Sequence, residues 1–322
     1  MATHPAPVAG VLRTAAAALA RAGIESARAE ARLICAHVLG VDRSRLMSAD
    51  GIDDAAVAEV ERITAARAEE KVPLQYLLGR APSGRLDLAV GPGVFIPRPE
   101  TELLVQWVLD RLPEPGGAGR PVIVDLCAGS GAIALEIAHA RPDADVHAVE
   151  LHDAALEWLH RNAEERAAAG DTPIEIHHGD ATDPGLLPGL RGRVTAVVSN
   201  PPYIPVTDDL PADVLGHEPA TALFGGTDGL VVVVPLVDLA ASLVAPGGFL
   251  AVEHDDTTGA DVAAVVKRQG RFGTVEQHTD LAGRPRFVTA TTRDDVDTGA
   301  RGGDDDRDDD EVDTTVQKGN TR

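Results

Sequence analysis

The residues Asn200 to Tyr203 read Asn-Pro-Pro-Tyr and follow an apolar run, 194–198, that predicts a buried strand. Ligands of open α/β sheets bind beyond the carboxyl ends of strands, which is where this motif would lie. Asn200 offers an amide oxygen, Pro201 and Pro202 form a stiff turn whose carbonyl oxygens lack competing N–H donors, and Tyr203 adds a flat face. The set suits a planar group with an NH2, such as a carboxamide or a base amine. The same four residues would also form a purely structural element, a rigid Pro-Pro turn with a packed tyrosine.

A second motif leads from a β-branched strand, 122–126, through a glycine-rich turn into an apolar helix. Glycines permit a tight turn and close approach of a ligand, and residues 129–134 fit a dinucleotide fingerprint, so a nicotinamide-dependent dehydrogenase is one interpretation. Asp125 argues against it, because a carboxylate at the mouth of the turn would repel a pyrophosphate. It suits an ammonium or sulfonium group, and S-adenosylmethionine carries both and no phosphate. The turn residues expected to contact this ligand are Cys127, Ala128, Gly129, Ser130 and Gly131.

Two further predicted strands also end in acids. The strand over 144–149 leads to Glu150, roughly 20 residues beyond the glycine turn, where an acid can bind ribose hydroxyls. The strand over 174–178 leads to Asp180 and Ala181, which we expect to meet an adenine edge. Any one of these acids could instead be a helix cap, a solvated strand end or a turn cap. Acids at three successive strand ends, together with the glycine turn, favour a ligand site.

Together these motifs resemble the class I S-adenosylmethionine-dependent methyltransferases. Asn-Pro-Pro-Tyr alone is shared with adenine-N6 DNA methyltransferases. Phe-Ile-Pro-Arg-Pro-Glu-Thr-Glu at 95–102 and Gly-Gly-Thr-Asp-Gly-Leu at 225–230 are more specific. With them, residues 8–291 resemble the glutamine methyltransferases of peptide chain release factors, the HemK/PrmC family. The other stretches that carry this resemblance are 73–79, 86–94, 218–223 and 280–284.

The resemblance implies an α/β fold with a Rossmann-like, doubly wound, mostly parallel seven-stranded sheet and a small N-terminal helical domain. It implies that S-adenosylmethionine donates a methyl group to the glutamine of the Gly-Gly-Gln loop in release factors, which modulates translation termination. We expect Asn200 and the Pro201 carbonyl to accept the two N–H bonds of the glutamine amide while Tyr203 packs on its plane. Alignment and charge stabilisation would then serve an in-line transfer without a strong general base.

The sequence departs from the family pattern at several positions. Cys127 and Ala128 stand where the family often has Gly and a small hydroxyl residue, and both are small enough to keep the turn. Glu150 replaces the more usual Asp and still reaches a ribose. Ala181 stands where an aromatic residue is common, which predicts weaker adenine stacking. Residues 255–258, Asp-Asp-Thr-Thr, stand where the family often has Gly and Gln. This departure leaves only weak support for a functional role of Glu253 or His254, which precede the segment.

The chain divides into four parts by composition and periodicity. Residues 1–80 have helical spacing and form a helical domain that, by resemblance, grips the protein substrate. Residues 81–97 form a linker with a short hairpin, residues 98–291 the methyltransferase domain, and residues 292–322 an acidic disordered tail. Within the third part, the valines at 231–234 favour a strand, whereas the spacing up to residue 243 favours a helix, which is our prediction.

The composition fits a cytoplasmic protein. The 322 residues include only two cysteines, which excludes a disulfide framework, and no run is long enough for a membrane span. The chain lacks a signal peptide pattern, and its histidines, including the pair at 177–178, form no ligand pattern in the sequence, so we expect no metal. We expect a monomer.

The net charge of −22 bears on the choice of substrate. A duplex-binding protein would need a basic surface, so stable nucleic-acid binding is not expected, which counts against a base methyltransferase. A glutamine methyltransferase of a ribosomal protein is a second alternative that the sequence separates only weakly. A non-enzymatic module that binds S-adenosylmethionine or a nucleotide is a third alternative, and an intact Asn-Pro-Pro-Tyr argues against it, because binding alone does not need that motif.

Overall fold

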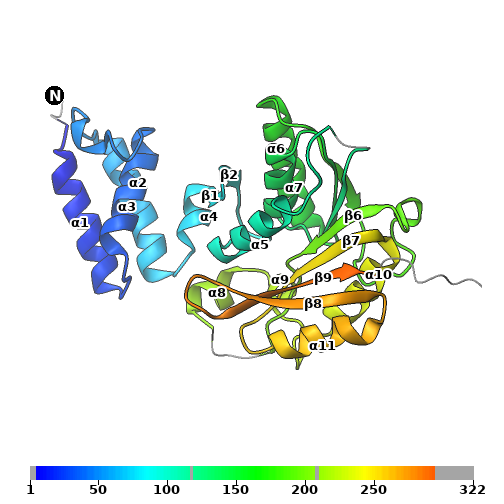
Figure 1. Ribbon diagram of the computed structural model, residues 1–322. Helices are drawn as coiled ribbons and strands as arrows, with labels where there is room; N and C mark the ends of the chain where they lie inside the picture. Colours follow the sequence, from blue (N-terminus) through cyan, green and yellow to red (C-terminus); the bar gives the residue numbers. More distant parts are fainter. Residues whose placement is uncertain (1–4, 117–118, 207–209, 294–322) are drawn as a thin grey trace, which may run out of the picture.

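The computed structural model describes residues 5–116, 119–206 and 210–293. The tail predicted over 292–322 therefore lies, from residue 294 on, outside the described residues. Figure 1 shows a group of N-terminal helices at one side, a small hairpin next to it, and a sheet covered by helices on both faces. No helix in the described ranges combines the length and the apolar content that a membrane crossing requires.

Four α-helices build the N-terminal part, where the periodicity predicted a helical domain. They are α1 (Val8–Arg21), α2 (Ala27–Leu39), α3 (Asp54–Glu69) and α4 (Leu74–Leu78), with a 3₁₀ turn at Leu46–Ser48. Asp53 caps α3 by accepting a hydrogen bond from the Ala56 N–H at 2.8 Å. The apolar faces of the helices meet in one core, in which Leu19, Ile34 and Ile63 are buried.

The link to the sheet is the antiparallel hairpin of β1 (Arg80–Ser83) and β2 (Leu86–Ala89), followed by α5 (Pro99–Leu109). Pro99 occupies the first turn of α5, where a missing N–H costs nothing. The side chain of Asn162 donates to the Ala89 and Ser130 carbonyls and accepts from the Ala89 N–H. Asn162 thus fixes the hairpin to the turn that contains Ser130.

The main sheet has seven strands in the order β5-β4-β3-β6-β7-β9-β8, and only β9 runs antiparallel to its neighbours, which confirms the predicted mostly parallel architecture. Leu126 at the end of β3 lies opposite Val149 of β4 and Ser199 of β6. The carboxyl ends of these three strands therefore meet at one edge, which brings the residues that follow them together. The strands are β3 (Val122–Leu126), β4 (Asp145–Glu150), β5 (Glu175–His178), β6 (Val194–Ser199), β7 (Val244–Glu253), β8 (Phe272–Thr279) and β9 (Pro285–Thr292).

Helices cover both faces of the sheet because successive strand residues point to opposite sides. Val124 packs in the core with α10 (Val233–Leu243) and α11 (Gly259–Gln269). Its neighbour Ile123 packs in the other core, with α5, α6 (Ala132–Ala140) and α7 (Asp153–Ala168). The predicted helix is confirmed from Val233 to Leu243 as α10, where the burial of valines and leucines overrides the strand preference of valine, whereas Val231 and Val232 form a turn before it.

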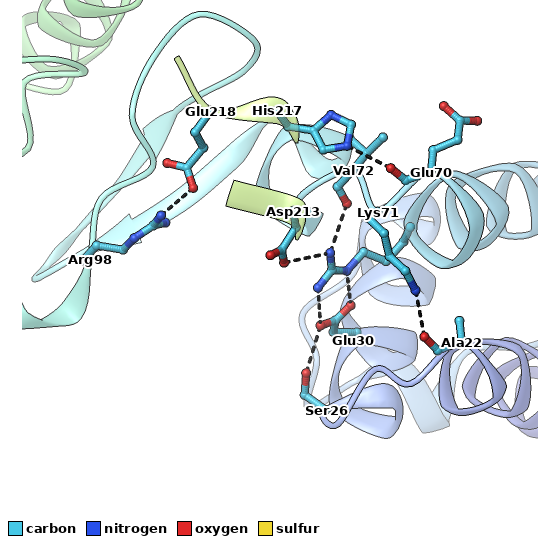
Figure 2. A network of polar contacts seen from close by, with 11 residues as sticks. Ala22, Ser26, Glu30, Glu70, Lys71, Val72, Arg98, Asp213, His217 and Glu218 are labelled. Atoms are coloured by element: carbon cyan, nitrogen blue, oxygen red, sulfur yellow. Dashed lines mark hydrogen bonds and ion pairs between the residues drawn. The ribbon is translucent and has the colours of Figure 1, made fainter. Parts of the chain in front are cut away.

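The segment after the Asn-Pro-Pro-Tyr motif contacts the N-terminal helices, and Figure 2 shows these contacts from close by. It contains α8 (Ala212–His217) and α9 (Ala220–Leu223). Arg67 of α3 contacts Glu30 of α2 at 2.9 Å and Asp213 of α8 at 3.2 Å. His217 lies 2.9 Å from the Glu70 carbonyl, and Glu218 accepts hydrogen bonds from Arg98 and the Ile96 N–H. The helical part is thereby joined to a segment that borders the site described next.

Candidate active site

A cavity of about 360 Å³ opens at the carboxyl edge of the sheet, a size within the usual range for small-molecule sites. Its walls come from the turns after β3, β4, β5 and β6, as the sequence predicted, and from α9. Most of the predicted residues line it, whereas Asp125 and Gly131 do not. Those that line it are Cys127, Ala128, Gly129, Ser130, Glu150, Asp180, Ala181, Asn200, Pro201, Pro202 and Tyr203.

The turn after β3 adopts backbone angles that explain its glycines. Gly129 and Gly131 have φ of 56° and 88°, and a Cβ on Gly131 would lie 2.7 Å from Leu159. Cys127 also has a positive φ, 65°, which is the physical reason why glycine suits this position. Gly131 therefore acts by shaping the turn and not by bordering the cavity.

Glu150 holds this turn in place through its carboxylate. Oε1 accepts from the Leu151 and His152 N–H groups, both at 2.9 Å, and Oε2 accepts from the Gly129 N–H at 2.8 Å. An ionised carboxylate oxygen has two acceptor sites, so Oε1 is saturated while Oε2 keeps one. Glu150 thus stabilises the turn through three hydrogen bonds and keeps one free acceptor on the cavity wall, which fits a ribose hydroxyl.

Asp125 lies deeper than its place in the sequence suggested. The side chain is fully buried, Oδ2 accepts from the Ala134 N–H at 3.1 Å, and Oδ1 has no partner among the described residues. Burial, with a smaller contribution from Glu150, raises its pKa to about 8. Asp125 thus holds the start of α6. Since it does not line the cavity, it would influence a bound cation only indirectly, through the turn that it supports.

Asp180 and Ala181 lie where β5 ends, as predicted. Asp180 Oδ1 accepts from the Thr182 N–H at 2.8 Å and the Thr182 hydroxyl at 2.7 Å, which makes a local turn. Oδ2 has no such bond among the described residues and remains available to a ligand amine. Ala181 is buried at the cavity wall, and its small side chain offers no stacking surface.

The Asn-Pro-Pro-Tyr loop is anchored at both ends. The Ser199 hydroxyl donates to the Leu126 carbonyl at 2.6 Å, and Ile204 exchanges backbone hydrogen bonds with Leu223 and Gly225. Among the hydrogen bonds of the described residues, none uses the carbonyl oxygen of Pro201. That oxygen is therefore available as an acceptor.

The glycines at 225–229 lie against the backbone of this loop, which explains the Gly-Gly-Thr-Asp-Gly motif. A Cβ on Gly225 would lie 2.7 Å from the Pro202 carbonyl oxygen, and one on Gly229 would lie 2.3 Å from the Tyr203 carbonyl oxygen. Only glycine permits so close an approach. The Gly-Gly-Thr-Asp-Gly motif therefore packs against the Asn-Pro-Pro-Tyr loop and helps to fix its backbone.

Gly229→Ala is expected to lower turnover about tenfold and the free energy of unfolding by about 1–2 kcal/mol, because the methyl group would displace the Tyr203 backbone. Gly283→Ala is the matched control, since Gly283 has a similar φ, 78° against 73°, but open space around it. Thermal unfolding and catalytic turnover would be measured on both variants. Equal turnover in the two would contradict the role of Gly229.

A buried network behind Asn200 was not predicted. Thr101 Oγ1 lies 3.3 Å from Asn200 Nδ2 and 2.8 Å from Glu253 Oε2, and the Tyr203 hydroxyl donates to Glu253 Oε1 at 2.9 Å. Thr101 and Glu253 are 6% and 2% exposed. Burial raises the pKa of Glu253 to about 7 and that of Tyr203 well above its usual value. The only signal for Thr101 in the sequence was its position in the motif Phe-Ile-Pro-Arg-Pro-Glu-Thr-Glu at 95–102.

One group of potential metal ligands occurs among the described residues, away from the cavity, and consists of His147, Glu175 and His177. His147 Nδ1 and His177 Nε2 lie 3.0 Å apart in nearly parallel rings, 25° between planes. With the ring centroids 5.2 Å apart, the two nitrogens point at one another as a hydrogen-bonded pair. The pair spans β4 and β5, a proximity that the sequence did not reveal.

Comparison with known proteins places these features in a family. A model of the PrmC N-terminal domain matches residues 10–79, and a model of the methyltransferase small domain matches residues 86–212. The release factor glutamine methyltransferase of Mycolicibacterium smegmatis is 52% identical over 281 residues, which cover 87% of this chain and 96% of that protein. The protein of the same name from Mycobacterium tuberculosis is 46% identical over 281 residues, 86% of this chain and 88% of that one.

A solved structure, the precorrin-6y C5,15-methyltransferase of Geobacter metallireducens, aligns with a TM-score of 0.43 at 14% identity, over 64% of this chain and 95% of that one. The extensive identity to the curated relatives decides the assignment. The α/β fold is that of the class I methyltransferases, and the chain belongs to the release factor glutamine methyltransferase family.

Proposed function

We propose that this protein methylates the side-chain amide nitrogen of the glutamine in the Gly-Gly-Gln loop of peptide chain release factors, with S-adenosylmethionine as the methyl donor. The observation that carries the proposal is a pair of free acceptors on the cavity wall. Asn200 uses its Nδ2 on Thr101 and so keeps Oδ1, and the Pro201 carbonyl is unpaired among the described residues. Two acceptors match the two N–H bonds of a primary amide.

The residues at the other strand ends fit the cofactor. Glu150 has one free acceptor site for a ribose hydroxyl, and Asp180 has a free oxygen for the adenine amine. The backbone from Cys127 to Ser130 borders the cavity, and the glycine turn leaves room for a ligand close to it. When bound, S-adenosylmethionine supplies an activated methyl group on a sulfonium.

The chain contributes alignment and charge stabilisation. An amide nitrogen is a poor nucleophile because its lone pair is delocalised into the carbonyl. Asn200 and Pro201 would hold both N–H bonds of the glutamine, which points the nitrogen lone pair away from them. The same two oxygens stabilise positive charge as it develops on the nitrogen. Tyr203 closes this side of the cavity, and the departing proton leaves through the same acceptors or through water.

The helical part, residues 1–80, would hold the body of the release factor while the loop glutamine enters the cavity. Supporting this, Arg67 and the Glu70 carbonyl contact α8, in the segment that leads to the cavity wall at Pro219. The negative net charge of −22 favours a protein substrate over a nucleic acid. We propose that the protein works as a monomer in the cytoplasm.

The test is to mix the purified protein with methyl-labelled S-adenosylmethionine and an unmethylated release factor. The same factor with its loop glutamine changed to alanine is the matched control. Label on the first factor only is the expected result. Label on neither factor, with cofactor binding shown by calorimetry, would overturn the proposed substrate. Transfer of label to a ribosomal protein or to RNA in a parallel reaction would then identify the acceptor class.

A further inference from the structure

The hydroxyl of Thr101 connects the substrate-holding amide of Asn200 to a buried carboxylate. Thr101 comes from the first turn of α5, Asn200 from the loop after β6, and Glu253 from the end of β7. Both links from the hydroxyl are hydrogen bonds, 3.3 Å to Asn200 and 2.8 Å to Glu253. The second oxygen of Glu253 is occupied by the Tyr203 hydroxyl.

The direction of these hydrogen bonds follows from counting protons. An ionised carboxylate only accepts, so both Tyr203 and Thr101 must donate to Glu253. A threonine hydroxyl has a single proton, and once it is donated to Glu253 the oxygen can only accept from Asn200. Asn200 must then present its NH2 to Thr101. Its carbonyl oxygen is left as the free end of the amide.

We propose that Glu253, acting through Thr101, fixes the orientation of the Asn200 amide so that its oxygen, and not its NH2, meets the substrate glutamine. The inference rests on the proposed function and adds two positioning residues to it. The reversed amide would present two donors to a substrate group that is itself a donor, and the glutamine N–H would lose its acceptor. The chain of bonds therefore selects the amide orientation that binds an NH2 group.

The protonation state of Glu253 controls this chain. A protonated Glu253 can donate to Thr101, which frees the threonine proton to point at Asn200 and reverses the amide. The charged and titratable groups that act on Glu253 are Tyr203 from the Asn-Pro-Pro-Tyr loop, Glu100 from α5 and Arg286 from β9, while Asp255, which follows β7, acts on Tyr203. Arg286 favours the ionised form and Glu100 opposes it, while burial dominates and raises the pKa to about 7.

The sign of the pH effect follows from this shift. The correct amide orientation requires the ionised carboxylate, which is present above pH 7 and is lost as the pH falls through about 7. The effect on stability has the opposite sign, because a Glu whose pKa is raised by folding disfavours the folded state once it ionises. A variant that removes the charge should therefore be more stable at pH 8 yet less active.

Thr101→Val tests the link, since valine keeps the shape and loses the hydroxyl, and Thr101→Ser restores the hydroxyl. We expect Thr101→Val to lower kcat on the order of tenfold, the scale of one hydrogen bond, with the Kd for S-adenosylmethionine and the KM for the release factor within about twofold of the wild type. Thr101→Ser should recover most of the loss. Wild-type kcat in Thr101→Val would overturn the proposal.

Glu253→Gln tests the charge through a pH profile of kcat/KM between pH 5.5 and 9. The wild type should lose activity below a pKa of about 7. Glu253→Gln should lack this limb, with the largest deficit at pH 8 and near equality at pH 6, and should unfold at a higher temperature at pH 8. An unchanged acid limb in Glu253→Gln, with lowered thermal stability, would reduce Glu253 to a structural residue. Failure of the wild type to methylate a release factor would instead refute the proposed function.

Discussion

Asn200→Ala is expected to lower the turnover of glutamine methylation on the order of 100-fold or more, the scale for the loss of one preorganised polar contact. The substitution removes the amide oxygen that accepts a glutamine N–H and leaves the Thr101 hydroxyl without its donor. The Pro201 carbonyl, the other acceptor, belongs to the backbone and remains. The cofactor contacts at Glu150 and Asp180 lie on other strand ends, so the affinity for S-adenosylmethionine should largely persist.

Single-turnover rates with a saturating release factor would isolate the chemical step from binding, and calorimetry would give the cofactor Kd. Asn200→Asp is a useful partner variant, because it keeps an acceptor oxygen of the same size but loses the NH2 that pairs with Thr101. We expect it to lie below the wild type, since two acceptors would then compete for the one proton of Thr101. Near-normal turnover in Asn200→Ala would refute the mechanism in which the Asn200 oxygen accepts an N–H bond of the glutamine.

That the turns after the parallel strands meet at one edge of the sheet followed from the sequence, because parallel strands place their following turns on one edge. Glu150 is the last residue of β4, and Asp180 and Asn200 follow β5 and β6 within two residues, so the local pattern was enough to bring them together. The helix at Val233–Leu243 was also predictable from its apolar spacing, although Val231 and Val232 lie in a turn before it. These inferences needed only the periodicity of apolar residues and the rule that the carboxyl ends of parallel strands meet at one edge of the sheet.

The supporting residues needed the tertiary structure. Thr101 and Glu253 lie 99 and 53 positions away from Asn200, and only the packing of α5 beside the end of β7 brings them together. Threonine in a first helical turn is ordinary, so no local signal marked it. The depth of Asp125 was misjudged for a related reason. The strand pattern predicts where Asp125 lies along the sheet. It does not predict that the side chain turns toward the start of α6.

Glu150→Ala is expected to weaken the binding of S-adenosylmethionine on the order of 100-fold, while the rate of methyl transfer in the bound complex falls much less. Two effects combine in the loss of affinity. The ribose hydroxyl loses a charged acceptor, a contact that contributes about 1.5–3 kcal/mol, and the Gly129, Leu151 and His152 N–H groups lose their common partner. The glycine turn would then have to be ordered by the ligand itself.

Glu150→Asp separates these effects, because it keeps the charge and shortens the side chain by one methylene. Its Kd should lie between those of the wild type and Glu150→Ala, since the carboxylate can still meet a ribose but no longer reaches all three N–H groups. Calorimetric Kd values and single-turnover rates at saturating cofactor would be compared for the three proteins. Unchanged cofactor affinity in Glu150→Ala would count against the ribose contact and would leave Glu150 as a support for the turn alone.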